Sequence, residues 1–372
     1  MKMSKKILTV ITLIVSVFVF AVCSMADSVS FESGDYAFSV NNDGETVTLT
    51  KYLGNDESVS IPQTVEYDGK IYTVDKIGAA FSGCENVKKI SIPESITVIG
   101  DSAFSSCYDL TEISISYGVT YIGNFAFFGC EKLTEISLPE SVTYIGSWVF
   151  TDCTGLREVY IPDGITSIGD NSFSYCTSLT KISLPDSITS IGNYAFYSCY
   201  SLDEISIPDN VVTIGNNAFN YCYSLTELSI PDSVESIGHD AFRTCYSLNF
   251  VYFYGDVPEV WGGNVFPLIP ESDLVIRYIE GKKGWTSSIW IANDGAAYKK
   301  SIFKDAEIGD INADGKIDLD DVIVLLRHIS KSAIITDPKV LEFCDIVDDG
   351  FIDMDDVIRL LRYVSKAIPS LR

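Results

Sequence analysis

Histidine and basic side chains are scarce in this 372-residue chain. There are 2 histidines, and the 26 lysines and arginines are outnumbered by 51 aspartates and glutamates, so the formal net charge is −25. This balance disfavours nucleic acid and bare anionic membrane as partners, because both are polyanions. His239 and His328 lie too far apart in the sequence pattern to supply the base of a Ser-His-Asp or Cys-His arrangement. We therefore expect no nucleic-acid binding and no enzyme activity.

Long apolar runs are absent after the first 22 residues. The only one, Ile7 to Val22, follows a lysine-rich start and precedes small residues. This order predicts a secretory signal peptide over residues 1–26. The run is shorter than the ~20 residues of a membrane-spanning helix, so we expect an extracellular protein without a membrane span. Lipidation at Cys23 is an alternative, although the bulky Val22 before it argues against a lipoprotein signal.

A period of 23 residues runs through the middle of the chain. Cysteine, phenylalanine, a leucine or valine, and glycine each recur at this spacing in the unit I-G-x-x-A-F-x-x-C-x-x-L-T-E-I-S-I-P. A unit this short cannot bury its own apolar residues, so the copies must stack. The cysteine and phenylalanine columns are Cys84, Cys107, Cys130, Cys153, Cys176, Cys199, Cys222 and Cys245, and Phe81, Phe104, Phe127, Phe150, Phe173, Phe196, Phe219 and Phe242.

Each unit contains one alternating segment, such as Thr111 to Ile115. Its two isoleucines lie on one face and its polar residues on the other, which predicts a half-buried strand. A proline ends this strand in most units, because proline cannot donate to a sheet ladder. Like strands would then pair in parallel about 4.8 Å apart. The predicted fold is a mainly β solenoid of about eight coils over residues 76–254.

The recurring residues resemble the BspA-like type of leucine-rich repeat, which occurs in secreted bacterial proteins. The resemblance covers residues 76–254. We expect residues 27–75 to form a β-rich N-terminal cap with a turn at Asp68-Gly69, because short alternating segments flank that pair. The repeat phase is lost from Gly255, and residues 255–300 are expected to form a C-terminal cap and linker.

The cysteine column has two interpretations. Secretion permits disulfides, and the number of columnar cysteines is even. However, stacked side chains about 4.8 Å apart exceed the usual Cβ separation of about 3.5 to 4.5 Å in a disulfide. We favour a buried ladder of free thiols, and a single file of cysteines offers no tetrahedral cage for a metal.

Two exposed surfaces could bind a ligand. One is a polar strip on the outer face of the predicted strands, which could equally be an ordinary solvated face. Its residues are Glu112, Ser114, Glu135, Ser137, Glu158, Tyr160, Lys181, Ser183, Glu204, Ser206, Glu227 and Ser229. The other is a set of tyrosines near the turns, which suit protein or glycan partners or pack between turns. These are Tyr108, Tyr175, Tyr200, Tyr221, Tyr223 and Tyr246.

A calcium-binding loop is predicted at residues 310–321. Oxygen-bearing side chains occupy positions 1, 3, 5, 9 and 12 of this loop, and Gly315 is at position 6. Such spacing surrounds a hard cation with oxygens, the position-7 carbonyl completing the set. Position 12 is Asp, where a typical EF-hand has Glu. Site 1 consists of Asp310, Asn312, Asp314, Lys316, Asp318 and Asp321.

The calcium loop and its following helix repeat 35 residues later. Val347 at position 3 of the second loop has no side-chain oxygen, so we expect this second site to bind calcium more weakly. Site 2 consists of Asp345, Asp349, Phe351, Asp353 and Asp356. The duplicated carboxylates would repel one another without metal, so folding of this all-α, EF-hand-like module should depend on calcium.

Residues 307–372 resemble a type I dockerin, the module that binds cohesin domains of scaffoldins in cellulosomes. The resemblance implies calcium-dependent docking and places cohesin recognition on Leu319, Asp320, Arg327, Met354, Asp355 and Arg362. We expect a secreted, cell-surface or cellulosome-associated binding protein whose repeats present a surface to a protein or glycan. The alternatives are a polysaccharide-degrading subunit with an unrecognised active site and an adhesin.

Overall fold

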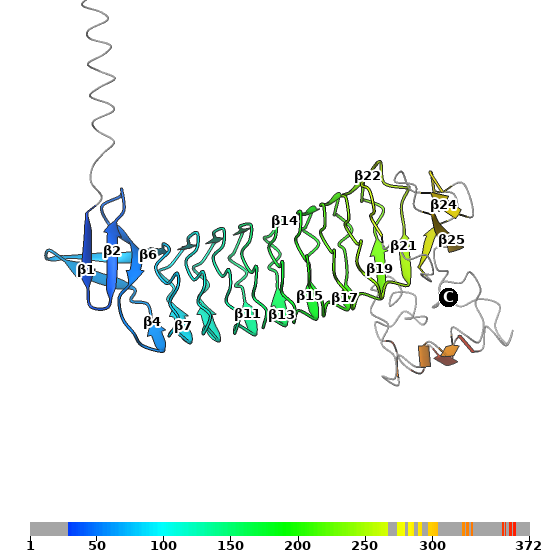
Figure 1. Cartoon of the computed structure of the whole chain (residues 1–372). Helices are drawn as coiled ribbons and strands as arrows, with labels where there is room; N and C mark the ends of the chain where they lie inside the picture. The colour runs from blue at the N-terminus through cyan, green and yellow to red at the C-terminus, as the bar shows by residue number, and fades with distance from the viewer. Residues whose placement is uncertain are drawn as a thin grey trace, which may run out of the picture.

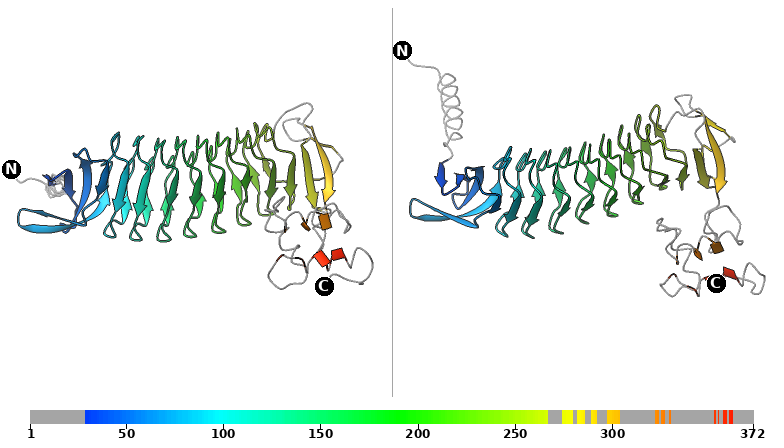
Figure 2. Two further views of the ribbon diagram at one scale, coloured as in Figure 1. Left: turned by 90° about the horizontal axis from the view of Figure 1, so that it is seen from below. Right: turned by 60° about the horizontal axis from the view of Figure 1, so that its bottom comes forward.

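The chain, seen in a computed structural model, winds into an elongated β-solenoid in which one coil stacks on the next (Figure 1). Figure 2 shows the same stack from two other directions. The signal peptide and the calcium loops predicted above lie outside the described residues. The structure describes residues 29–266, 274–279, 282–285, 289–291 and 297–303, with single positions between 322 and 361.

One side of the solenoid is a continuous strip of short parallel strands. Equivalent residues pair across neighbouring coils, for example Ile136 with Val159 and Val159 with Ile182. These inward residues are buried and the residues beside them are exposed, as the alternation predicted. The strip consists of β4 (Ser58–Ser60), β7 (Lys89–Ile92), β9 (Glu112–Ile115), β11 (Glu135–Ser137), β13 (Glu158–Tyr160), β15 (Lys181–Ser183), β17 (Glu204–Ile205), β19 (Glu227–Ile230), β21 (Phe250–Phe253), β23 (Val275–Ile279) and β25 (Ala297–Phe303).

A second ladder of shorter strands runs along the opposite side of the coils. Each of its two-residue strands precedes the repeat glycine and directs an isoleucine inward, such as Ile122 opposite Ile145. The sequence analysis did not predict this ladder. It consists of β8 (Val98–Ile99), β10 (Tyr121–Ile122), β12 (Tyr144–Ile145), β14 (Ser167–Ile168), β16 (Ser190–Ile191), β18 (Thr213–Ile214), β20 (Ser236–Ile237) and β22 (Val260–Trp261).

The core between the ladders is built from columns of identical residues. Each phenylalanine of the column is at most 1% exposed. Its ring stacks on the ring of the next coil, with centroids 5.0 to 5.6 Å apart from Tyr52 through Phe266. Burial of a side chain of this size stabilises a fold by about 1.5 to 3 kcal/mol. The phenylalanine column is therefore a main source of cohesion between coils.

The repeat glycine is required because neighbouring coils approach closely at this point. A Cβ at Gly192 would lie 2.7 Å from the backbone nitrogen of Asp170 and 2.8 Å from the carbonyl carbon of Gly169. Gly215 and Gly238 have similar contacts, at 2.6 and 2.5 Å from backbone atoms of the preceding coil. Real Cβ atoms do not come this close to backbone, so no other residue fits without displacement of a coil.

The N-terminal end of the solenoid is closed by antiparallel strands. β1 (Ser30–Ser33), β2 (Tyr36–Val40) and β3 (Thr46–Tyr52) form a meander, and β3 then pairs in parallel with β6 (Lys70–Ile77), the first strand of the second ladder. β5 (Thr64–Tyr67) and β6 form a hairpin. Asp68 and Gly69 both have positive φ, which confirms the predicted turn.

The predicted number of coils is too small. The solenoid has about 10 turns of about 23 residues, where the sequence pattern predicted about eight. Tyr52 and Phe266 extend the phenylalanine stack at its two ends, and β21 pairs in parallel with β23, which pairs in parallel with β25. β24 (Ile289–Ile291) pairs with β25 in the antiparallel direction. The extra coils lack the repeat signature, so their sequence did not reveal them.

Candidate binding surface

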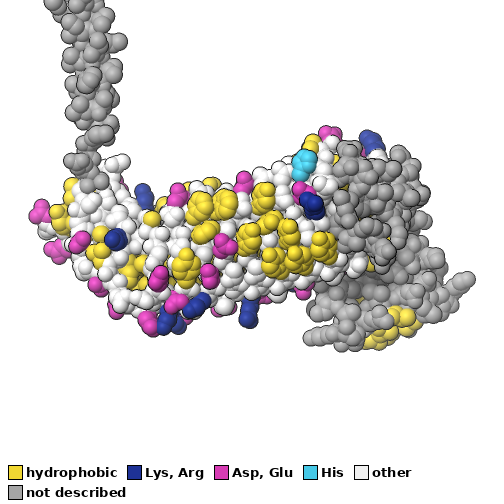
Figure 3. Space-filling model, viewed as in Figure 1, with side chains coloured by type: hydrophobic (Ala, Val, Ile, Leu, Met, Phe, Trp, Pro, Cys, Tyr) yellow, Lys and Arg dark blue, Asp and Glu magenta, His cyan; other side chains and the backbone are white. Residues whose placement is uncertain are grey.

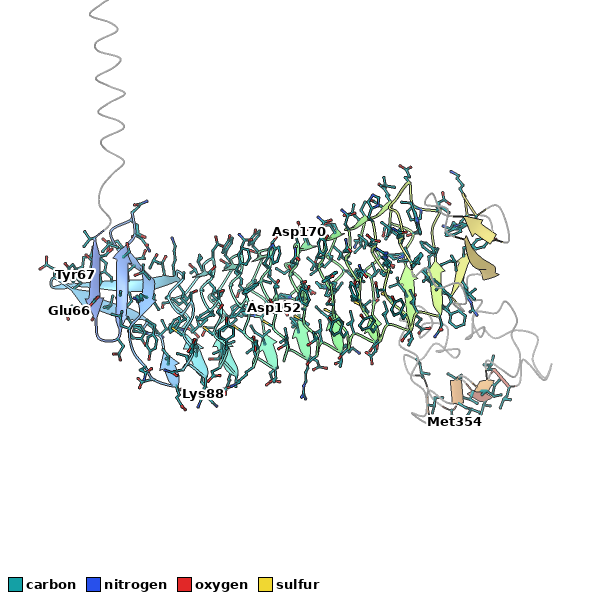
Figure 4. The ribbon with its side chains drawn as sticks, in the orientation of Figure 1. Glu66, Tyr67, Lys88, Asp152, Asp170 and Met354 are labelled. Atoms are coloured by element: carbon teal, nitrogen blue, oxygen red, sulfur yellow. The ribbon has the colours of Figure 1, made fainter. Side chains whose placement is uncertain are left out.

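Each coil contains a turn segment between its glycine and its cysteine, and two residues of most segments have positive φ. One lies two residues before the buried phenylalanine and the other two residues after it. We call the surface formed by these segments the turn face; Asp152, labelled in Figure 4, belongs to it. The first column is Ser102, Phe125, Trp148, Asn171, Tyr194, Asn217, Asp240 and Asn264, and the second is Gly83, Ser106, Gly129, Asp152, Tyr175, Ser198 and Tyr221.

Bulky aromatic residues occupy several of these left-handed positions. A left-handed conformation costs an L-residue about 1 to 2 kcal/mol, and glycine or asparagine is the usual occupant. Asn171 and Asn217 show that the coil accepts asparagine in the first column. Backbone preference therefore does not explain the aromatic side chains. The five, with φ between 56° and 67°, are Phe125, Trp148, Tyr175, Tyr194 and Tyr221.

Seven tyrosines form a connected group on the turn face, and Tyr197 is at its centre. The Tyr197 ring makes edge contacts with the rings of Tyr175, Tyr194 and Tyr221, with centroids 5.4, 5.5 and 5.3 Å apart. Such edge-to-face pairs are worth about 0.5 to 1.5 kcal/mol beyond the area they bury. The tyrosine cluster, as we name it, is Tyr175, Tyr194, Tyr197, Tyr200, Tyr221, Tyr223 and Tyr246.

The second half of the tyrosine cluster is a row of stacked rings. Tyr223 lies between Tyr200 and Tyr246, with centroids 5.1 and 5.9 Å away and interplanar angles of 24° and 20°. It also contacts Tyr221 edge to face at 5.9 Å. Tyr246 is 61% exposed and Tyr223 38%. The stacked faces cover one another, which leaves ring edges and hydroxyl groups for a ligand.

The tyrosine cluster is almost free of charge. Its four turn segments contain Ser, Asn, Thr and Tyr, and the only charged residues are Asp240 and Arg243, which form an ion pair at 3.3 Å. Burial raises the pKa of Tyr197 to about 12 and also raises the pKa of Tyr223. The phenols therefore stay neutral at physiological pH and can both donate and accept hydrogen bonds. Figure 3 shows hydrophobic and tyrosine side chains gathered on this face.

A smaller aromatic group lies on earlier coils of the turn face. The Phe125 ring stacks on Trp148 at 5.7 Å and contacts Phe128 edge to face at 6.1 Å. Phe125 and Trp148 are 39% and 37% exposed. In the first left-handed column, Asn171 lies between this group and Tyr194 of the tyrosine cluster.

Five of the six predicted ligand-surface tyrosines belong to the tyrosine cluster. Tyr108 is 43% exposed but is separated from Tyr200 in its column by the non-aromatic residues Glu131, Thr154 and Thr177. Tyr194 and Tyr197 were missed, although they are the contacts that join the group. The dense run of aromatic residues in the 193–200 segment, NYAFYSCY, was the available signal.

The polar strip predicted on the strands is exposed and highly charged. Glu135 pairs in register with Glu158, which in turn pairs with Lys181. Ion pairs join Lys89 to Glu112 at 2.5 Å and Lys181 to Glu204 at 3.9 Å. Exposed pairs of this kind add little to stability. Nothing in the strip gathers its charges into a hollow or converges them on one point.

The cysteine column is a ladder of buried free thiols, as we favoured. Each thiol from Cys107 to Cys245 donates a hydrogen bond, 3.0 to 3.3 Å long, to the carbonyl of the phenylalanine in the preceding coil. Burial raises the pKa of Cys107, Cys176 and Cys199 well above the usual thiol range. Thiols held neutral in this way are poor nucleophiles and metal ligands, so the column serves packing.

A further ladder, not recognised in the sequence, follows the repeat glycines. The side-chain oxygen of the residue after each glycine accepts a hydrogen bond from the backbone nitrogen one coil later. In the last of these, His239 accepts through Nδ1 from Gly263 at 2.8 Å, so this histidine has a structural role. The other pairs are Asp101 with Asn124, Asn124 with Ser147, Asp170 with Asn193, Asn193 with Asn216, and Asn216 with His239, at 2.7 to 2.9 Å.

The predicted calcium ligands and five of the six predicted recognition residues lie outside the described residues. The sixth, Met354, is helical and 49% exposed. Helical positions follow each predicted loop, and they share one pattern. Val322 and Leu325 are buried, as are their counterparts 35 residues later, Val357 and Leu360. The adjoining residues Ile323, Leu326, Ile358 and Leu361 are 39% to 43% exposed. Within the described residues, no helix has the length and apolar character to cross a membrane.

Stacked coils, one parallel strip and a conserved spacing of core columns define a leucine-rich-repeat β-solenoid that exposes an aromatic face. The model of the BspA type leucine rich repeat region matches residues 51–178 and 152–266 in 6 copies. The chain belongs to this family of leucine-rich repeat proteins. Among curated proteins, none matches it.

Two solved structures resemble the chain over most of its length. One is a leucine rich cell surface protein from Faecalibacterium prausnitzii, with 31% sequence identity and a TM-score of 0.55, covering 70% of this chain and 79% of that protein. The other is a leucine-rich repeat protein from Bacteroides ovatus, with 28% identity and a TM-score of 0.53, covering 74% of this chain and 79% of that protein.

Proposed function

We propose that the protein is a secreted, non-catalytic binding protein of the bacterial cell surface, whose solenoid presents its aromatic turn face to a protein or glycan. The observation that carries this proposal is the tyrosine cluster, an exposed and connected group of rings on a rigid stack of coils. Tyrosine is enriched at binding hot spots because it offers large contact area at small entropic cost. The similar protein from Faecalibacterium is described as a cell surface protein, which supports the location.

The second part of the proposal concerns attachment. The predicted loops at 310–321 and 345–356 would bind two calcium ions, the second more weakly, and residues 307–372 would then dock onto a cohesin module of a scaffoldin. The matching pattern of buried and exposed helical positions after the two loops supports the duplication. In this arrangement the C-terminal module sets where the protein is held, and the solenoid sets what it holds.

The attachment is tested by capture of the full-length protein on immobilised cohesins of several types, with calcium and with chelator. Docking predicts capture that needs calcium and that is lost when Asp310 and Asp345 are both replaced by alanine. Loss of position 1 removes a ligand from each loop without touching the solenoid. Calcium-independent capture, or none on any cohesin, would contradict this part of the proposal.

The duplication also suggests that docking can use either half of the module. The predicted recognition residues occur twice, at Leu319, Asp320 and Arg327 and at Met354, Asp355 and Arg362. Replacement of Asp320 and Arg327 by alanine should therefore leave cohesin binding largely intact, while replacement of both sets should abolish it. Complete loss on changing the first set alone would exclude two orientations.

Two other functions share the same surface and remain alternatives. A polysaccharide-degrading subunit would show hydrolysis of plant polysaccharides that is lost on changing a single carboxylate. An adhesin would bind whole host or neighbouring cells through the turn face, with no need for a scaffoldin. Cell-binding assays on variants of the tyrosine cluster and of the calcium loops separate the adhesin from a scaffoldin-attached protein.

A further inference from the structure

The tyrosine cluster and the polar strip offer a partner two different surfaces. The strip carries charged side chains in register, such as Glu135 beside Glu158, whereas the cluster's four turn segments contain only the paired Asp240 and Arg243 as charged residues. The cores of protein interfaces are depleted of charge and enriched in tyrosine. The composition of the cluster therefore matches an interface core and that of the strip does not.

The orientation of the rings distinguishes between glycan and protein as the ligand. A sugar packs its C–H groups on the open face of an aromatic ring, where the quadrupole is negative. In the row of Tyr200, Tyr223 and Tyr246 the faces are stacked on each other at 5.1 and 5.9 Å. Tyr197 is enclosed by edge contacts with three rings. What remains accessible is a rigid array of ring edges and hydroxyls, which suits amide and side-chain groups of a protein.

The side chains around the tyrosines support the same assignment. The turn segments of the cluster consist largely of Tyr, Ser and Asn, as in the 216–224 segment NNAFNYCYS. Protein-binding loops of antibodies have this composition, because tyrosine supplies rigid contact area while serine and asparagine supply adaptable hydrogen bonds. Tyr194 and Tyr221 hold left-handed positions where neighbouring coils have Asn217 and Ser198. The rings are thus present at positions where smaller residues satisfy the backbone.

We propose that the tyrosine cluster on the turn face binds a folded protein whose contacting surface is low in charge, and that the polar strip takes no part in this contact. The inference deepens the proposed function and rests on it. An uncharged partner surface is favoured because the cluster is the neutral region of a chain with a net charge of −25, so a charged partner would gain nothing there and an acidic one would be repelled elsewhere.

Residues from neighbouring coils provide matched variants that preserve the fold. The cluster variant Tyr194→Asn, Tyr221→Ser, Tyr223→Thr takes its new residues from the same columns, at Asn217, Ser198 and Thr177. The strip variant Glu158→Lys, Tyr160→Ser likewise takes the residues found at Lys181 and Ser183. Both are made in the full-length protein. Equal thermal midpoints and circular dichroism spectra establish that each variant is folded.

Two defined probes test the assignment. Small folded domains with a randomised surface, displayed on phage, are selected for binding to the full-length protein, and a glycan array is incubated with the same protein. We expect most selected domains to lose at least about tenfold in affinity for the cluster variant and less than about twofold for the strip variant. We expect no glycan whose binding depends on the cluster.

Each other outcome overturns the inference in a recognisable way. Selected domains that are lost with the strip variant would place the binding surface on the strands. A glycan bound by the wild type and lost with the cluster variant would assign a glycan ligand and leave the proposed function intact. Absence of binding by both probes would count against the proposed function as well. If the cluster variant does not fold, Tyr200→Phe with Tyr223→Phe keeps the stacked rings and removes two hydroxyls, and undiminished binding would then contradict the role given to the hydroxyl groups.

Discussion

The thiol of Cys199 donates a hydrogen bond, 3.1 Å long, to the backbone carbonyl of Phe173 in the preceding coil. The same carbonyl accepts the backbone N–H of Cys176 at 3.2 Å. One buried oxygen thus joins the turn of its own coil to the side chain of the next. The cysteine column satisfies the core polar groups of the solenoid without any covalent bond between coils.

Reactivity of the thiols follows from this burial. Cys84 is only partly buried, whereas the other seven columnar cysteines are buried and their sulfur atoms donate hydrogen bonds. In native protein with Cys344→Ser, we expect a thiol reagent to modify Cys84 first and the remainder at the rate of unfolding. Time-resolved alkylation followed by mass spectrometry measures the order. Fast labelling of Cys199 in the native state would contradict the burial.

Replacement of the repeat glycine should destabilise the solenoid. In Gly192→Ala the new Cβ would meet backbone atoms at 2.7 and 2.8 Å, so two coils must separate. We expect a loss of about 1 to 3 kcal/mol, typical of overpacking. The matched control is Gly169→Ala, whose nearest atom is the Ser147 side chain at 3.1 Å and which should lose less. Chemical denaturation of both variants gives the comparison, and equal losses would show that the coils can separate freely.

Asp152 is expected to make stability depend on pH. Burial, with a smaller contribution from Glu131, raises the pKa of this carboxyl in the folded protein. A raised pKa favours the folded state at low pH, and this contribution is lost as pH rises through the folded pKa. Asp152→Asn should therefore raise the thermal midpoint slightly at pH 7 and leave it unchanged at pH 3. A gain of equal size at both values would mean that asparagine acts through its tolerance of positive φ alone, and Asp163→Asn controls for net charge.

Relief of the left-handed backbone provides a test of the strain at exposed rings. Phe125→Asn should not lower stability and should raise it by up to about 1 kcal/mol, because asparagine tolerates this φ while the lost stacking on Trp148 is modest. Tyr108→Asn is the control, since Tyr108 is similarly exposed but has no positive φ. Denaturant midpoints measure the difference. A loss of more than about 1 kcal/mol for Phe125→Asn would show that its ring contacts outweigh the strain.

Calcium removal should affect the C-terminal module and not the solenoid. The predicted carboxylates of residues 310–321 and 345–356 repel one another without metal, so we expect chelation to abolish the helical circular dichroism signal. The β signal and the burial of the cysteine column should be unchanged. An unaltered helical signal in the presence of chelator would falsify the calcium dependence of this module.

Much of the solenoid could be predicted from the sequence, because equivalent residues of stacked coils become neighbours at one fixed spacing. The phenylalanine and cysteine columns, the inward isoleucines and the Asp68-Gly69 turn follow from this spacing and from local turn chemistry. The second ladder was missed because its strands are only two residues long, as in Ile122 opposite Ile145, too short for an alternating pattern. The outer coils were missed because they bury different residues in the same columns.

The period of 23 by itself determined the stack, since burial of a repeated apolar face has one economical solution. The tyrosine cluster was decided by the tertiary structure. Its central contacts join Tyr197 to Tyr175, 22 residues earlier, and to Tyr221, 24 residues later, so they cross between columns. Which columns meet depends on the path of the turn, and that path is set by left-handed residues whose φ the sequence does not display. The repeated residues therefore specify the scaffold, and the geometry of the turns specifies the surface that it presents.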